Sequence, residues 1–96
     1  MRLNPDYVFQ RFEDFSVLVP VGKPDQYFNG ILRLNGTATY IVESLREETT
    51  REALVQLLID RYEGEEAQFV ESVDRVLETL RRVGALKETE LQRIRN

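Results

Sequence analysis

The side chains that could carry acid–base or nucleophilic chemistry in this chain are carboxylates, hydroxyls and arginines, because histidine and cysteine are both absent. Their absence excludes an imidazole base, the Ser-His and Cys-His nucleophile pairs, disulfides and the common zinc ligand sets. Two adjacent glutamate pairs remain, Glu47-Glu48 and Glu65-Glu66. The first lacks the spacing of a calcium loop, and the second suits the positive end of a helix better than an acid–base dyad. We therefore expect no enzyme activity, no metal and no cofactor.

Length and charge narrow the class of protein further. Ninety-six residues of 11.3 kDa make one small domain, which we place at residues 1–87 with a polar tail at 88–96. The chain has no apolar run of about 18 residues and no signal-peptide pattern at its start, so we expect a soluble, cytoplasmic protein. A net charge of −4 without a polybasic patch argues against nucleic acid or a membrane as partner.

The first third of the chain predicts three antiparallel strands, over residues 7–12, 15–21 and 27–34. Pro20 cannot donate to a strand ladder, so the second strand ends near it or lies at a sheet edge there. In the second strand Leu18 is the one apolar residue on an otherwise polar face. The apolar face of that strand consists of Phe15, Val17, Val19 and Val21.

After residue 34 the apolar period changes from two to about 3.6, which predicts three helices, over residues 36–46, about 50–63 and 65–83. Asn35 is suited to cap the first helix, and Thr49-Thr50-Arg51-Glu52 has the pattern of a capping box for the second. Gly64 and Gly84 are predicted stops of the second and third helices. Together the elements predict an α+β domain, a three-stranded antiparallel sheet followed by three helices. It resembles a winged helix-turn-helix whose strands precede the helices.

The order of these signals resembles the PqqD-like family. A strand ends in Leu34-Asn35-Gly36-Thr37-Ala38, and an aliphatic helix, a Thr-rich cap and a Leu–Leu–Tyr pattern follow. The third helix then ends in the Leu-x-x-x-Gly-x-Leu pattern of residues 80–86. The resemblance covers about residues 28–87. A longer link at 21–27 and the glycine at 36 depart from the namesake, so the pathway need not be that of pyrroloquinoline quinone.

The resemblance implies a non-catalytic recognition element of ribosomally made, post-translationally modified peptides. Such a domain holds the leader of a precursor peptide as an added strand between the third strand and the third helix. It then presents the precursor to a modifying enzyme, frequently a radical S-adenosylmethionine protein. A sheet edge with unpaired backbone groups can accept such a strand. The predicted binding residues are Phe28, Asn29, Gly30, Ile31, Leu32, Arg33 and Leu34 on the strand, Phe69, Val73 and Val76 as groove floor, and Arg75 and Arg82 as rim cations.

Each of these residues also has a purely structural interpretation. Gly30 could admit a partner backbone or simply form a bulge. Arg33 could pair with a leader carboxylate or be a solvated strand charge. The apolar stripe of the third helix, residues 69–83, is wide enough to leave area for a groove, yet each residue in it could belong to the core.

Two other functions compete with peptide binding. A winged helix-turn-helix could bind DNA, but the third helix begins with Glu65 and Glu66 and carries five acids against three arginines over residues 65–84. That surface would be repelled by phosphates. Alternatively, the open strand could serve self-association and give a homodimer.

Overall fold

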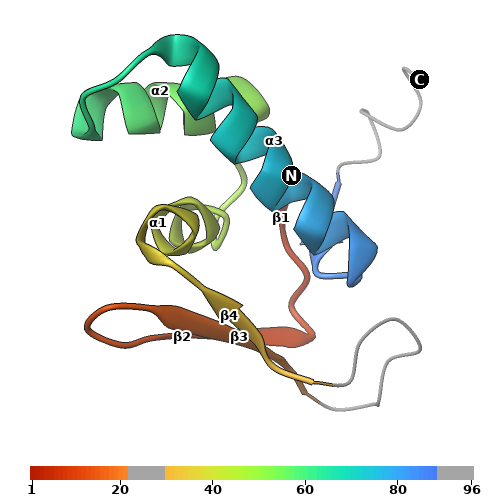
Figure 1. Ribbon diagram of the computed structural model, residues 1–96. Coiled ribbons are helices and arrows are strands. Elements are labelled where there is room, and N and C mark those ends of the chain that lie inside the picture. Colours follow the sequence, from red (N-terminus) through yellow and green to blue (C-terminus); the bar gives the residue numbers. More distant parts are fainter. Residues whose placement is uncertain (22–29, 89–96) are drawn as a thin grey trace.

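The computed structural model describes residues 1–21 and 30–88, and it places three helices on one face of a three-stranded antiparallel sheet (Figure 1). The order within that sheet is β2-β3-β4. A second sheet has two strands, β1 and β5. The predicted α+β architecture is confirmed. The elements are β1 (Arg2–Leu3), β2 (Tyr7–Arg11), β3 (Ser16–Pro20), β4 (Leu32–Leu34), α1 (Gly36–Ser44), α2 (Arg51–Arg61), α3 (Glu66–Arg82) and β5 (Leu86–Lys87).

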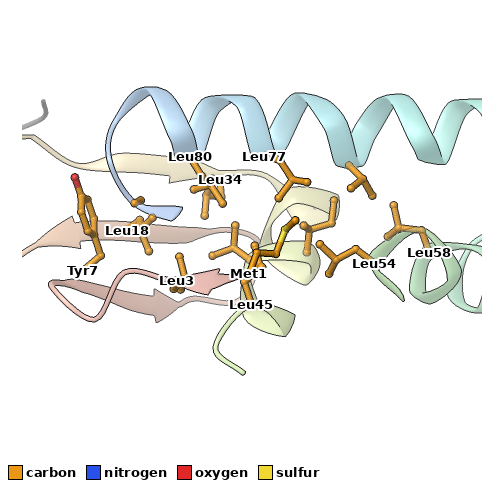
Figure 2. Close-up of a cluster of buried hydrophobic side chains, with 14 of the residues drawn as sticks. Met1, Leu3, Tyr7, Leu18, Leu34, Leu45, Leu54, Leu58, Leu77 and Leu80 are labelled. Atoms are coloured by element: carbon orange, nitrogen blue, oxygen red, sulfur yellow. The ribbon is translucent and has the colours of Figure 1, made fainter. Parts of the chain in front are cut away.

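The core lies between the sheet and the helices (Figure 2). Leu18 and Leu34 contribute from the sheet, and every helix contributes buried aliphatic side chains. Those of the helices are Ile41 and Val42 of α1 with its C-cap residue Leu45, Leu54, Val55 and Leu58 of α2, and Val73, Leu77 and Leu80 of α3. The helices therefore pack on the sheet and on one another around a single cluster. No helix in the described part of the chain is long and apolar enough to cross a bilayer.

The middle strand buries the face opposite to its apolar stripe. Ser16 and Leu18 are fully buried, whereas Val17 and Val19 are half-buried and Val21 is exposed. The register, which pairs Ser16 with Leu34 and Leu18 with Leu32, brings these inward residues together. Alternation shows that two faces differ, but not which of them a helix covers. The outer face of the sheet also holds the exposed apolar side chains Val8, Phe12 and Ile31.

Two of the predicted helix signals act as expected and two are shifted. The Asn35 side chain accepts a hydrogen bond from the Ala38 amide at 3.0 Å, and Gly84, with a φ of 80°, follows the end of α3. There the Ala85 amide donates to the Leu80 carbonyl at 2.8 Å, which is a Schellman closure. For α2, however, Thr50 is the cap and its side chain accepts from Ala53 at 3.1 Å, so Glu52 does not occupy the third position of a capping box. α2 also ends at Arg61, with Tyr62 as its C-cap, before Gly64.

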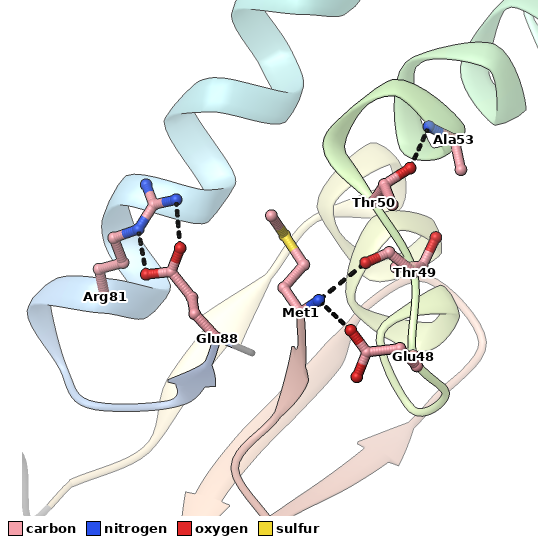
Figure 3. Close-up of polar contacts among 7 residues, drawn as sticks. All are labelled: Met1, Glu48, Thr49, Thr50, Ala53, Arg81 and Glu88. Atoms are coloured by element: carbon pink, nitrogen blue, oxygen red, sulfur yellow. Dashed lines mark hydrogen bonds and ion pairs between the residues drawn. The ribbon is translucent and has the colours of Figure 1, made fainter. Parts of the chain in front are cut away.

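The short β1–β5 sheet ties the two ends of the described chain together beside the helices (Figure 3). The Met1 amino group contacts the Glu48 carboxylate and donates to the Thr49 carbonyl at 2.8 Å. On the other side, Arg81 of α3 forms a two-pronged contact with Glu88, at 3.1 and 3.3 Å. Strands of two residues carry no readable periodicity, and the sequence did not predict this sheet.

Candidate peptide-binding edge and groove

Hydrogen bonds beside the β2–β3 ladder determine which neighbour each backbone group of β3 faces. The Phe12 amide donates to the Phe15 carbonyl at 2.7 Å, and the Val21 amide donates to the Asp6 carbonyl at 2.8 Å. In an antiparallel pair, residues that exchange hydrogen bonds alternate with residues that do not. The odd-numbered residues from 15 to 21 therefore direct their amides and carbonyls toward β2, and the even-numbered residues of β3 direct theirs toward β4.

The same alternation continues into β4. Leu34 and Leu32 lie opposite the even-numbered Ser16 and Leu18, so their backbone groups point toward β3. Arg33, between them, directs its amide and its carbonyl away from the sheet. β4 pairs with β3 alone, and the described residues place no strand on its other side. The predicted open edge is therefore present at β4.

A groove of about 330 Å³ runs beside this edge, between β4, the first turn of α1 and one face of α3. Its volume is at the small end of the range of ligand pockets. Ala38 of α1 and Val76 of α3 are half-buried apolar residues at its surface. The residues around it are Arg33, Leu34, Asn35, Thr37, Ala38, Ser72, Arg75, Val76, Thr79 and Leu80.

Two arginines lie beside the open edge, one on each of its faces. Arg33 of β4 has its guanidinium carbon 4.1 Å from the centre of the Phe15 ring, on the outer face of the sheet. Arg75 of α3 is exposed and lies 3.5 Å from Glu71 of the same helix. Among the described residues, no aspartate or glutamate lines the groove. The open edge therefore has a cation on each of its two faces, in a chain of net charge −4.

An ion pair between α2 and α3 holds the helix that forms one wall of the groove. Arg51 Nε donates to Asp74 Oδ1 at 2.6 Å, and Arg51 Nη2 donates to Asp74 Oδ2 at 2.9 Å. This hydrogen-bonded, two-pronged contact lowers the pKa of Asp74 and raises that of Arg51. Asp74 directly precedes Arg75, so the contact lies one residue from a groove side chain.

The structure brings together part of the predicted site. Leu34, Arg75 and Val76 line the groove, and Arg33 borders it with its side chain on the outer face of the sheet. Ile31 is 65% exposed just before β4, Gly30 is half-buried in a bend, and Leu32 packs against the core. Phe28 and Asn29 lie outside the described residues.

Three predicted side chains do not line the groove. Val73 is fully buried in the core, so the prediction that it forms groove floor is wrong. Phe69, one turn earlier in α3, packs against the edge of the core near Gly64. Arg82 is exposed near the end of α3, beside Glu78 rather than at the groove.

Sequence reasoning missed the small polar residues of the groove, namely Asn35, Thr37, Ser72 and Thr79. Ser72 and Thr79 lie seven residues apart and flank Val76, so they share one face of α3. That face lies at the boundary between the apolar stripe and the charged surface. Small side chains at such a boundary leave a depression in the helix surface. Their spacing in the sequence was the feature that could have indicated the groove.

Comparisons with known proteins agree with this geometry. A solved structure described as "TbiB1 in Complex with the TbiA(beta) Leader Peptide" has the same fold, with a TM-score of 0.76 and 16% sequence identity, over 94% of this chain and 100% of that one. A comparison with curated protein sequences gives no match. Residues 16–86, well over half of the chain, match the family profile described as coenzyme PQQ synthesis protein D. The open edge, the adjoining groove and this match lead to one identification: the chain belongs to the PqqD family.

Proposed function

We propose that this protein is a non-catalytic module that binds the leader segment of a ribosomally made precursor peptide by strand addition at β4. The observation that carries the proposal is the outward-facing backbone of Arg33 beside a groove that α3 closes on one side. An added strand would exchange hydrogen bonds with this edge and place alternate side chains into the groove. The similar fold solved with a leader peptide supports this choice of partner.

Ile31 is expected to extend the binding edge beyond β4. Continuing the alternation by two residues from Arg33 directs the Ile31 amide away from β3 as well. The next position, Gly30, would face Pro20, which has no amide to donate. The edge offered to a peptide therefore centres on residues 31–33, over the apolar side chains of Ala38 and Val76.

The module is further proposed to present the bound precursor to a modifying enzyme, of the radical S-adenosylmethionine type, and to do no chemistry of its own. The charged groups whose pKa departs from its ordinary value support a structural role for them. Asp74 and Arg51 pair with each other, and the Arg61 guanidinium lies 4.4 Å from the centre of the Tyr40 ring and 5.9 Å from that of Tyr62. None of these groups lines the groove.

The test begins with peptides selected from a displayed library of random 12-residue sequences on the immobilised protein. A selected peptide is then titrated into isotope-labelled protein. The largest amide shifts are expected at residues 30–34 of the edge and at groove residues 72–80 of α3. Shifts confined to α2 and the β2–β3 hairpin would contradict the proposed site.

A proline substitution tests strand addition itself. Ile31→Pro removes the outward amide, and the loss of one backbone hydrogen bond plus the ring's bulk should weaken binding about fivefold or more. Ile31→Ala is the matched control, because it shortens the same side chain and keeps the amide. Unchanged affinity of Ile31→Pro, in a variant whose circular dichroism is normal, would exclude strand addition in this register.

A further inference from the structure

Two arginines lie at the open edge, Arg33 on β4 and Arg75 on the α3 wall of the groove. The Arg75 side chain belongs to the groove side of the edge, whereas the Arg33 side chain lies on the outer face of the sheet. Among the described residues, no acidic side chain lines the groove. The rest of the chain is acidic on balance, with 17 Asp and Glu against 13 Lys and Arg. Cations at the edge of an otherwise acidic protein favour a segment of the opposite charge at that edge.

Arg33 is held in position before any peptide binds. Its guanidinium lies over the Phe15 ring at 4.1 Å, and no carboxylate in residues 1–21 and 30–88 forms an ion pair with it. Stacking occupies one flat face of a guanidinium and leaves the N–H groups at its edge free to bind an oxygen pair.

The register determines where a partner of Arg33 must lie. The Arg33 side chain is on the outer face of the sheet, on the same side as Val17, which is its partner in β3. A strand added on the other side of β4 would place one side chain directly opposite Arg33 on this outer face. The residues before and after that position would point inward, toward Ala38 and Val76.

We propose that the segment accepted at β4 carries an aspartate or glutamate opposite Arg33, flanked on both sides by apolar residues. This inference rests on the proposed function and adds the chemistry of the peptide to it. Arg75, at the α3 wall, contributes a second attraction for negative charge. Its contribution is smaller, because the side chain of Glu71 already lies 3.5 Å from it.

Parallel selections test this specificity. Random 12-residue peptides are selected on the natural protein, on Arg33→Glu and on Arg46→Glu, which makes the same charge change at an exposed residue outside the groove. The natural protein and Arg46→Glu should enrich the apolar–acidic–apolar pattern. Arg33→Glu should enrich lysine or arginine at the central position. If Arg33→Glu does not fold, the selection is made on Arg33→Gln instead. Peptides selected on Arg33→Gln should show no preference for an acidic residue at the central position.

A selected peptide is then used to measure how much its acidic residue contributes to the affinity. Replacing its acidic residue by the neutral amide should weaken binding about twofold to fivefold, the range of an opposed charge pair across strands. Arg33→Gln should abolish that difference, while Arg46→Glu should preserve it. Selection of peptides without an acidic preference, or an identical preference on Arg33→Glu, would overturn this inference and leave the proposed function standing. Failure to select any peptide would overturn both.

Discussion

The buried hydroxyl pair of Ser16 and Thr39 joins the three elements that carry the candidate site. Ser16 of β3 is fully buried and Thr39 of α1 nearly so, with their oxygens 2.7 Å apart. The Thr39 hydroxyl donates to the Leu34 carbonyl of β4 at 3.3 Å. Thr39 has one hydroxyl hydrogen, so Ser16 must be the donor in the contact between the two side chains. Two successive hydrogen bonds thus connect Ser16 of β3 to Thr39 of α1, and Thr39 to Leu34 of the edge strand β4.

Because Ser16 donates to Thr39, replacing Thr39 should lower the free energy of unfolding more than replacing Ser16. Thr39→Val keeps the shape of the side chain but removes two hydrogen bonds and leaves the buried Ser16 hydroxyl without an acceptor. We expect it to lower the free energy of unfolding by about 2–3 kcal/mol. Ser16→Ala leaves Thr39 its bond to Leu34, and should cost about 1 kcal/mol. In the double variant no donor is stranded, so its cost should be smaller than the sum of the two by about 1 kcal/mol.

Urea unfolding followed by circular dichroism measures all four proteins, since the chain has no tryptophan to report by fluorescence. For a slope of about 1–3 kcal/mol per molar urea, the midpoint of Thr39→Val should fall by about 0.7–3 M. If the loss of unfolding free energy in the double variant equalled the sum of the two single losses, the assignment of Ser16 as donor to Thr39 would be refuted. A larger loss for Ser16→Ala than for Thr39→Val would refute it as well.

Two further predictions concern the capping and the clamping of the helices. Thr50→Ala should lower the free energy of unfolding by about 1 kcal/mol, and Thr49→Ala by less, because Thr49 contributes backbone groups alone to the contacts at Met1. Equal losses in urea unfolding would contradict the assignment of the cap. Asp74 should titrate below its ordinary pKa of 3.8 in a carbon-detected magnetic resonance titration, because Arg51 stabilises its charged form. The stability that this lowered pKa contributes is present above the unfolded-state pKa and is lost as the pH falls through the folded-state value, so the deficit of Asp74→Asn at neutral pH should vanish in acid.

The elements of this fold could be predicted because their signals are local. A change of apolar period at residue 34, a capping asparagine at 35 and a glycine at 84 each act within one turn of chain. The buried face of β3 could not be predicted in the same way, because both of its faces carry apolar side chains. Only the position of α1, which brings Thr39 to Ser16, decides that the face with the serine is the buried one.

Only part of the candidate site could likewise be predicted from the sequence. The edge at β4 follows from strand order and could be anticipated from the third strand of a short sheet. The groove wall could not be resolved on α3, since its apolar stripe is wide and helical spacing alone does not separate Val73, in the core, from Val76, at the groove. The distinction depends on where β4 passes α3, which is a property of the assembled domain.

The position of Arg33 also bears on whether the open edge should join two copies of this protein. An antiparallel pairing of β4 with β4 of a second copy, centred on its middle residue, would place Arg33 directly opposite Arg33, and like charges in that position are destabilising. The strand is also only three residues long, so self-pairing would gain few hydrogen bonds to offset the repulsion. A peptide with an acidic residue at the same place turns the repulsion into attraction. One side chain at the centre of the edge can therefore both reject a second copy and select the guest, which is how specificity is built from a repulsive and an attractive term together.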